Sequence, residues 1–130
     1  MNIIHSSSTT KLLPTTVEFL NNNLDCSLII DPVTYIKNNT KFNFEKSDPA
    51  IIGFDTTEID NLLALINQMN SKSIVINIEN YFGLLLPIET GLKYIKSNDY
   101  NNYGGCFDII DTSQNKYIIL DENDRVYIKF

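Results

Sequence analysis

Residues 106–130 read CFDII-DTSQNK-YIIL-DEND-RVYIKF, and this stretch decides the fold class. Three short segments that are apolar or alternate between apolar and polar, at 106–110, 117–120 and 125–129, are separated by clusters rich in Asp, Asn and Ser. Alternation with a period of two, interrupted by turn-forming residues, predicts three consecutive strands, which is a β-meander. A tail built in this way argues against a regular doubly wound α/β fold.

The segment 56–69 gives the strongest helix signal. Its apolar residues recur at spacings of three and four, which is typical of a helix that packs on a core; they are Ile59, Leu62, Leu63, Ile66 and Met69. Helix-start signals at Pro14 and at Asp31-Pro32 predict two more helices, at 15–24 and 32–39, and a short fourth helix is predicted at 89–97. Strands are predicted over 2–5, 26–30, 41–45, 50–54 and 73–78, and 81–86 is ambiguous between strand and turn.

These elements together predict an α+β fold. We expect a single mixed, mostly antiparallel sheet of five to seven strands, with two to four helices packed on it and a C-terminal β-meander. The 130 residues contain no internal repeat and no linker, so residues 1–130 are expected to form a single globular domain.

The cysteines and the N-terminal residues predict the compartment. Cys26 and Cys106 lie far apart without CxxC spacing, and we expect both to be reduced thiols, with one disulfide as the alternative. Residues 1–14 lack the basic and apolar regions of a secretory signal, and no apolar run reaches the length of a membrane span. The sequence therefore predicts a cytoplasmic protein that does not bind a membrane.

Charge narrows the choice of partner. Asp and Glu outnumber Lys and Arg 16 to 10, which gives a formal net charge of -6. Nucleic acid is disfavoured, because its affinity comes largely from neutralising phosphates. An acidic surface favours a basic protein partner, although solubility alone would explain the same composition.

Reactive residues are scarce. The one histidine, His5, has no neighbouring cysteine or acid in sequence, and the glycines form no phosphate-binding loop. Residues 111–122 resemble a calcium loop in their oxygen ligands, but Lys116 stands where that loop needs glycine, and a hairpin turn explains the same residues. We therefore predict no catalytic site, no metal and no cofactor.

Two sets of residues are predicted to contact a partner. The first is an acidic set at the strand ends and turns of the meander, expected to lie largely on one rim: Asp108, Asp111, Asp121, Glu122 and Asp124. The second is a polar and aromatic loop, in which tyrosine offers a large contact area at low entropy cost: Asp99, Tyr100 and Tyr103. The alternative is a solvated turn region whose tyrosines pack locally.

Small size, acidity and few reactive groups favour a binding protein. The first hypothesis is a bacterial inhibitor of the immunity or antitoxin type, which neutralises a basic protein such as a nuclease-type toxin by covering its active site. The alternative is a structural or adaptor domain that acts through self-association, such as a homodimer, or through pairing of sheet edges. A small carboxylate-dependent enzyme is the third hypothesis.

Overall fold

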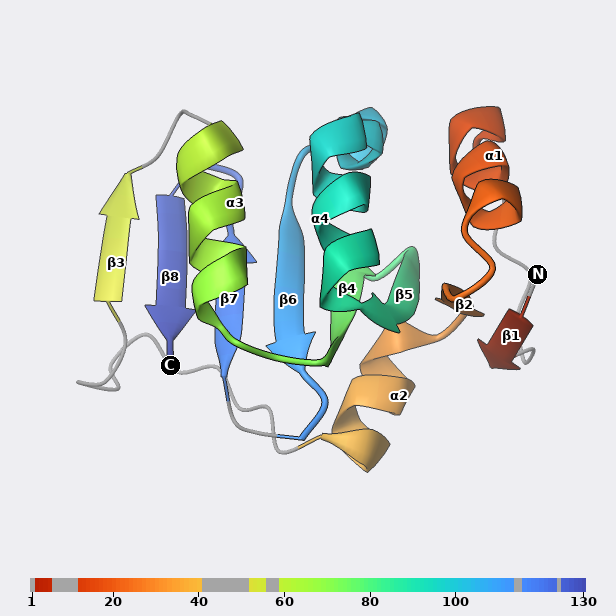
Figure 1. Cartoon of the computed structure of the whole chain (residues 1–130), viewed down its shortest axis with the longest axis horizontal. Helices are drawn as coiled ribbons and strands as arrows, with labels where there is room; N and C mark the ends of the chain where they lie inside the picture. Colours follow the sequence, from red (N-terminus) through yellow and green to blue (C-terminus); the bar gives the residue numbers. More distant parts are fainter. Residues whose placement is uncertain (1, 6–11, 41–51, 56–58, 114–115, 124) are drawn as a thin grey trace.

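The computed structural model describes residues 2–5, 12–40, 52–55, 59–113, 116–123 and 125–130. Within these residues the chain forms one eight-stranded sheet with the strand order β1-β2-β5-β4-β6-β7-β8-β3 (Figure 1). The strands are β1 Asn2–His5, β2 Ser27–Ile29, β3 Ile52–Asp55, β4 Ser73–Ile78, β5 Phe82–Pro87, β6 Phe107–Asp111, β7 Tyr117–Leu120 and β8 Arg125–Lys129. The helices are α1 Pro14–Asn22, α2 Pro32–Asn39, α3 Ile59–Gln68 and α4 Ile88–Ser97, followed by the 3₁₀ helix η1 Asp99–Tyr103.

The predicted α+β class and the C-terminal meander are confirmed. β6, β7 and β8 pair antiparallel in sequence order, and only β1 and β2 pair parallel among the described strands. The sheet is therefore mixed and mostly antiparallel, and its eight strands exceed the predicted range by one. The predicted strand at 41–45 lies outside the described residues.

A tight turn resolves the segment that was ambiguous in the sequence. Glu79 and Asn80 both have positive φ, 50° and 62°, and together with Tyr81, whose backbone N–H donates a hydrogen bond to the carbonyl oxygen of Ile78 at 2.9 Å, they form the three-residue connection between β4 and β5. Two consecutive residues of positive φ match the right-handed twist of the flanking strands. In the sheet β2 lies beside β5 and β6 lies beside β4, so that β4 and β6 are the two central strands.

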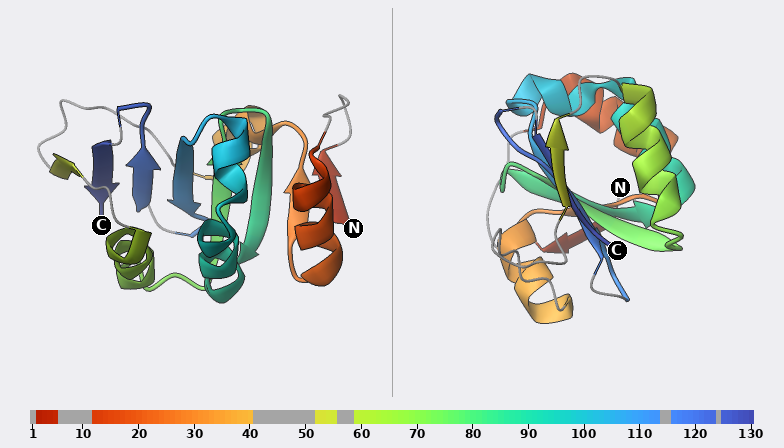
Figure 2. Two further views of the ribbon diagram at one scale, coloured as in Figure 1. Left: turned by 90° about the horizontal axis from the view of Figure 1, so that it is seen from above. Right: turned by 90° about the vertical axis from the view of Figure 1, so that its left-hand side faces the viewer.

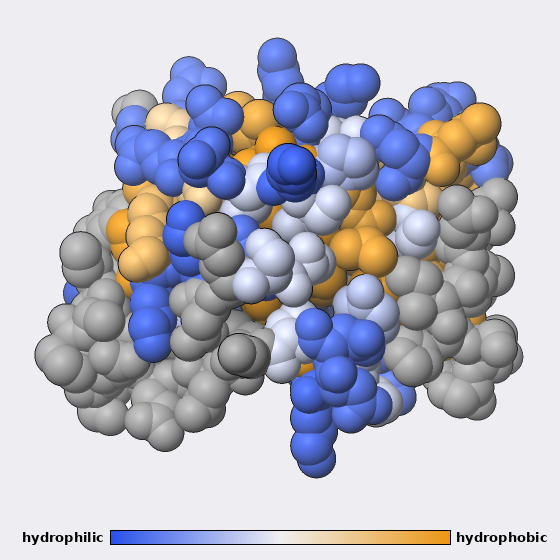
Figure 3. Space-filling view, turned by 60° about the horizontal axis from the view of Figure 1, so that its bottom comes forward, coloured by the Kyte–Doolittle hydropathy of each residue, from blue (hydrophilic) through white to orange (hydrophobic). Residues whose placement is uncertain are grey.

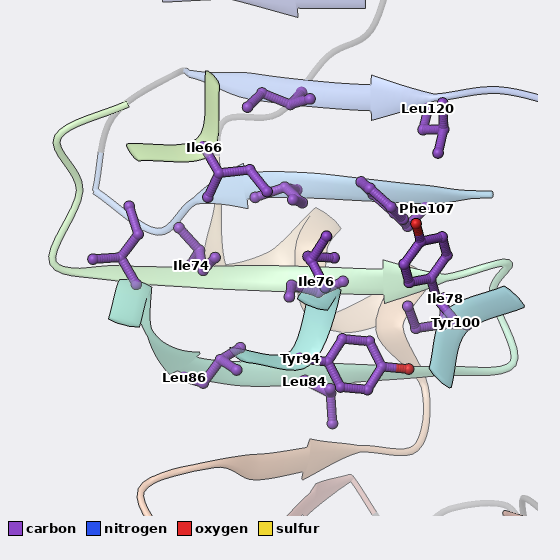
Figure 4. Packing of buried hydrophobic residues seen from close by; sticks show 14 of the residues in the cluster. Ile66, Ile74, Ile76, Ile78, Leu84, Leu86, Tyr94, Tyr100, Phe107 and Leu120 are labelled. Carbon is purple, nitrogen blue, oxygen red and sulfur yellow. The ribbon is translucent and has the colours of Figure 1, made fainter. Parts of the chain in front are cut away.

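Helices cover both faces of the sheet. α1, α3 and α4 lie on one face and α2 lies on the other (Figure 2). Because alternate residues of a strand point to opposite faces, β4 contributes Ile74, Ile76 and Ile78 to the larger core and Val75 to the smaller one. In Figure 4 these three isoleucines lie among Leu84 and Leu86 of β5 and side chains from the helices.

The helix-start signals act as expected. Pro14 begins α1, and Asp31 caps α2 by accepting a hydrogen bond from the backbone N–H of Thr34 at 3.2 Å. α3 buries Leu62 and Ile66. α2 exposes polar side chains such as Lys37, together with the apolar side chain of Val33.

Two further expectations concern the thiols and the membrane. Cys26 and Cys106 are both free cysteines, the first buried and the second partly exposed. Among the helices of the described residues, none combines the length and the apolar character that crossing a bilayer requires.

Candidate functional site

An acidic pocket of about 370 Å³ lies at one end of the sheet. Its lining comes from three places: the end of β4 with the β4–β5 turn, the start of β6, and the turn between β7 and β8. Four carboxylates line it, Glu79, Asp108, Asp121 and Glu122, and none of the described residues that line it is basic. We call this depression, with its four carboxylates, the acidic pocket.

Antiparallel pairing brings these distant segments together. Asn77 near the end of β4 lies opposite Asp108 near the start of β6, and Asp108 lies opposite Ile119 near the end of β7. In an antiparallel sheet the end of one strand meets the start of its neighbour. The pocket is therefore a consequence of the strand order β4-β6-β7.

The carboxyl group of Asp108 is largely withdrawn from solvent. Burial raises its pKa from 3.8 to about 6, and the nearby charge of Glu79 acts in the same direction. The side-chain amide of Asn77 donates a hydrogen bond to it at 3.2 Å, which lowers the pKa by less than burial raises it. A cation in the pocket would favour the ionised form of this group.

Glu79 and Glu122 are exposed at the mouth of the pocket. The Glu79 carboxyl group lies over Gly104, where an added Cβ would be 3.4 Å from Glu79 Cδ. Asp121 has a different role, because one of its oxygens accepts hydrogen bonds from the backbone N–H groups of Asn123 at 2.9 Å and Arg125 at 3.1 Å. Asp121 therefore closes the β7–β8 turn as well as lining the pocket.

The thiol of Cys106 also lines the pocket. Burial, followed by a hydrogen bond to Glu79 and the charges of Glu79, Glu122 and Asp121, raises its pKa to about 12. The nucleophilic form of cysteine is the thiolate. Cys106 is thus protonated at neutral pH, and its surroundings are unlike those of a catalytic cysteine.

Asp111 does not belong to the acidic pocket, which corrects the expectation that it shares a rim with the other acids. It lies at the opposite end of β6 and is 2% exposed. It accepts hydrogen bonds from the hydroxyl group of Ser71 and from the backbone N–H of Ser113 at 2.7 Å. Successive turns of a meander lie at opposite ends of its strands, so the acidic residues of the meander lie at two opposite ends of the sheet. Asp124 lies outside the described residues.

Two residues of the loop predicted to make an exposed contact are buried, although Asn101 and Asn102 beside them are exposed. Asp99 is 5% exposed and Tyr100 is 6% exposed. Asp99 accepts hydrogen bonds from the hydroxyl groups of Thr15 at 2.5 Å, Thr16 at 2.7 Å and Tyr94 at 2.8 Å. This carboxylate therefore joins η1 to α1 and α4.

The two tyrosines of that loop pack within the protein. Tyr100 packs edge-to-face on Phe107 with ring centroids 4.9 Å apart. The hydroxyl oxygen of Tyr103 accepts a hydrogen bond from the backbone N–H of Leu13 at 2.9 Å, and its ring packs on Phe82. The alternative of locally packed tyrosines describes this loop, and Asp99 and Tyr100 offer little surface to a partner.

The described side chains were also expected to hold no metal ion. Among the described residues there is no group of three or more His, Cys, Asp and Glu side chains that could hold a metal ion. Positions 114 and 115 of the calcium-loop-like segment lie outside the described residues. Comparisons of the chain with protein-family models, with curated proteins and with solved structures found no match.

Proposed function

We propose that this chain is a small inhibitor of the immunity type, which binds a basic protein and covers its active site. The acidic pocket would receive a lysine or arginine side chain of that partner. The observation that carries the proposal is the gathering of Glu79, Asp108, Asp121 and Glu122 around one open depression.

The electrostatics of the pocket support a cationic partner. Burial raises the pKa of Asp108, the charge of Glu79 adds to that rise, and a cation nearby would offset both effects. A partner's ammonium or guanidinium group about 4 Å from one carboxylate would gain roughly 1 to 4 kcal/mol, depending on how far water is excluded. Such a pocket also steers a basic protein toward the correct face before contact.

An inhibitor of this kind needs no reactive group of its own. A protein that grips phosphate groups carries cations in its active site, and an acidic inhibitor competes for them. Asp99 and Tyr100 are withdrawn from the proposed contact because they are buried. The contact then consists of Glu79 and Glu122 at the mouth, with Asp108 and Asp121 within.

A capture experiment with two matched variants tests the proposal. Immobilised wild-type chain is expected to retain a basic protein from a lysate of the native host at low ionic strength and to release it as salt is added. The pocket variant Glu79→Gln/Glu122→Gln should lose that protein. The control Glu18→Gln/Asp60→Asn changes two exposed acids on α1 and α3 and should keep it. Both variants change the net charge from -6 to -4, so total charge cannot explain a difference.

Two results would contradict the proposal. Equal retention by the pocket variant and the control would show that the acidic pocket is not the contact. A captured protein that stays bound at high salt and has no basic surface would show that charge does not drive binding. Retained protein is identified by mass spectrometry, and inhibition of its activity by wild-type chain then tests coverage of its active site.

A further inference from the structure

A second surface lies on the face of the sheet that α1, α3 and α4 cover, away from the acidic pocket. It is a groove of about 400 Å³ between α3 and α4. Leu63 and Ala64 of α3 and Leu92 of α4 supply its apolar part. In Figure 3 hydrophobic residues are visible between the hydrophilic side chains of these helices, along the upper part of the view.

The rim of this groove is basic. Lys93 and Lys96, one helical turn apart on α4, both line it and are exposed, and the side chain of Asn67 lines it from α3. The one acid of the lining, Glu89, lies four residues before Lys93 and leaves one positive charge in excess. A groove with an apolar floor and a positive rim suits an apolar side chain that is flanked by a carboxylate.

The same chain presents such a side chain at its β4–β5 turn. Tyr81 is 56% exposed, which makes it one of the most exposed large apolar residues of the described chain. Its ring lies tilted toward that of Tyr103, with 6.3 Å between the ring centroids, and more than half of the side chain remains exposed. Two positions before it stands the exposed carboxylate of Glu79.

We propose that the α3–α4 groove binds the β4–β5 turn of a second copy of this chain. Tyr81 of one copy would pack on Leu63 and Leu92 of the other, with Glu79 facing Lys96. Exposed tyrosine is a frequent anchor of protein interfaces, because it buries a large area with few rotatable bonds. The charges of the two surfaces are opposite, which favours this orientation over others.

The contact joins two unlike surfaces. Two copies can therefore make this contact twice, each placing its turn in the groove of the other, or the contact can repeat along a row of copies. A single aromatic anchor with one or two ion pairs is smaller than a standard interface, so the association is weak and depends on concentration. Because the β4–β5 turn also lines the acidic pocket, a second copy and a basic partner would compete for it.

Sedimentation velocity of the purified full chain tests this inference. At low salt the weight-average mass is expected to rise between roughly 10 µM and roughly 1 mM protein, the range in which weak interfaces form. Tyr81→Ser and Lys93→Glu/Lys96→Glu should each weaken the association about tenfold, which corresponds to about 1.4 kcal/mol. The control Lys37→Glu/Lys72→Glu makes the same charge change at exposed lysines outside the groove and should leave the association intact.

A charge exchange gives the sharpest result. Lys96→Glu and Glu79→Lys should each associate poorly alone, and a mixture of the two should associate again, because each supplies the surface that the other has lost. A chain that stays monomeric over the whole range overturns the inference, and so does association that all variants share equally. No second protein is present in this experiment, so its result does not depend on whether a basic partner exists.

Discussion

Gly91→Ala tests how closely α4 lies on the sheet. A Cβ added at Gly91 would stand 2.6 Å from Cδ1 and 3.4 Å from Cγ1 of Ile74 in β4. In an exposed helix the same change would stabilise the protein by about 1 kcal/mol, because glycine has a poor helix propensity. Ile74 is fully buried, so its methyl group has little room to move, and overpacking of this kind costs about 1 to 3 kcal/mol. We expect a net loss of about 0 to 2 kcal/mol.

A second substitution separates the two effects. Ile74→Val removes Cδ1, the atom nearest the new methyl group, and should by itself cost about 0.5 to 1.5 kcal/mol. In the double variant the Cβ at position 91 occupies the space that Cδ1 leaves. The overpacking is then relieved and the gain in helix propensity remains, so the double variant should be nearly as stable as the wild type. The expected coupling energy is about 1 to 3 kcal/mol.

Urea unfolding of the wild type and the three variants measures this cycle, with circular dichroism as the signal and the m-value as a check that the same surface is exposed. The reasoning is refuted if Gly91→Ala alone stabilises the protein by about 1 kcal/mol. It is also refuted if the two changes add within about 0.5 kcal/mol, the level expected for residues that do not touch.

Three further predictions concern buried polar groups and the thiol. Asp99→Asn should cost about 2 to 4 kcal/mol in urea unfolding, because three buried or partly buried hydroxyl groups lose a charged acceptor, whereas Asn101→Ala at the exposed surface should cost much less. Asp108→Asn should raise the free energy of unfolding at pH 8 and not at pH 4: the folded-state pKa of about 6 lies above the ordinary 3.8, so the penalty for ionising Asp108 is absent below about pH 4 and complete above about pH 6. A difference between the two proteins that does not change with pH would contradict this assignment. Cys106 should react slowly with iodoacetamide at pH 8 and faster in Glu79→Gln, which removes a negative charge that helps to hold the thiol protonated; an unchanged rate would contradict that role.

The sequence predicts those parts of the fold whose cause is local. The meander follows from alternation and turn residues within 25 positions, and α2 follows from Asp31 and Pro32 at its start. The segment 81–86 was ambiguous because an apolar run of this length fits more than one structure. What makes it a strand is its pairing on both sides, with β4 and with β2, and pairing with β2 is not visible in the local sequence.

The residues of the candidate site also differ in whether the local sequence is enough to predict them. Asp108, Asp121 and Glu122 could be selected because they lie within the acidic C-terminal meander, but Glu79 comes from a different hairpin, which only the pairing of β4 with β6 brings near them. For Asp99 the prediction from the sequence is wrong in the other direction, because it was selected as a contact residue and is buried. Its polar neighbours suggest an exposed loop, whereas its burial depends on Thr16, 83 residues earlier in the chain.

The acidic pocket lowers the stability of the folded protein. A hairpin of this type prefers Asn or Gly at positive φ, and Glu79 occupies such a position at 50°. Asp108 keeps a pKa near 6 because its charge is partly buried beside another carboxylate. Strained backbone and unfavourable charge both persist where the surrounding structure holds them, and both concentrate at sites that contact another molecule. Asp121 closes a turn and Glu79 accepts a hydrogen bond from the thiol of Cys106, but neither contact neutralises the negative charge of these groups. A cationic partner would offset the repulsion among these groups, and this is the physical argument for a contact surface at this end of the sheet.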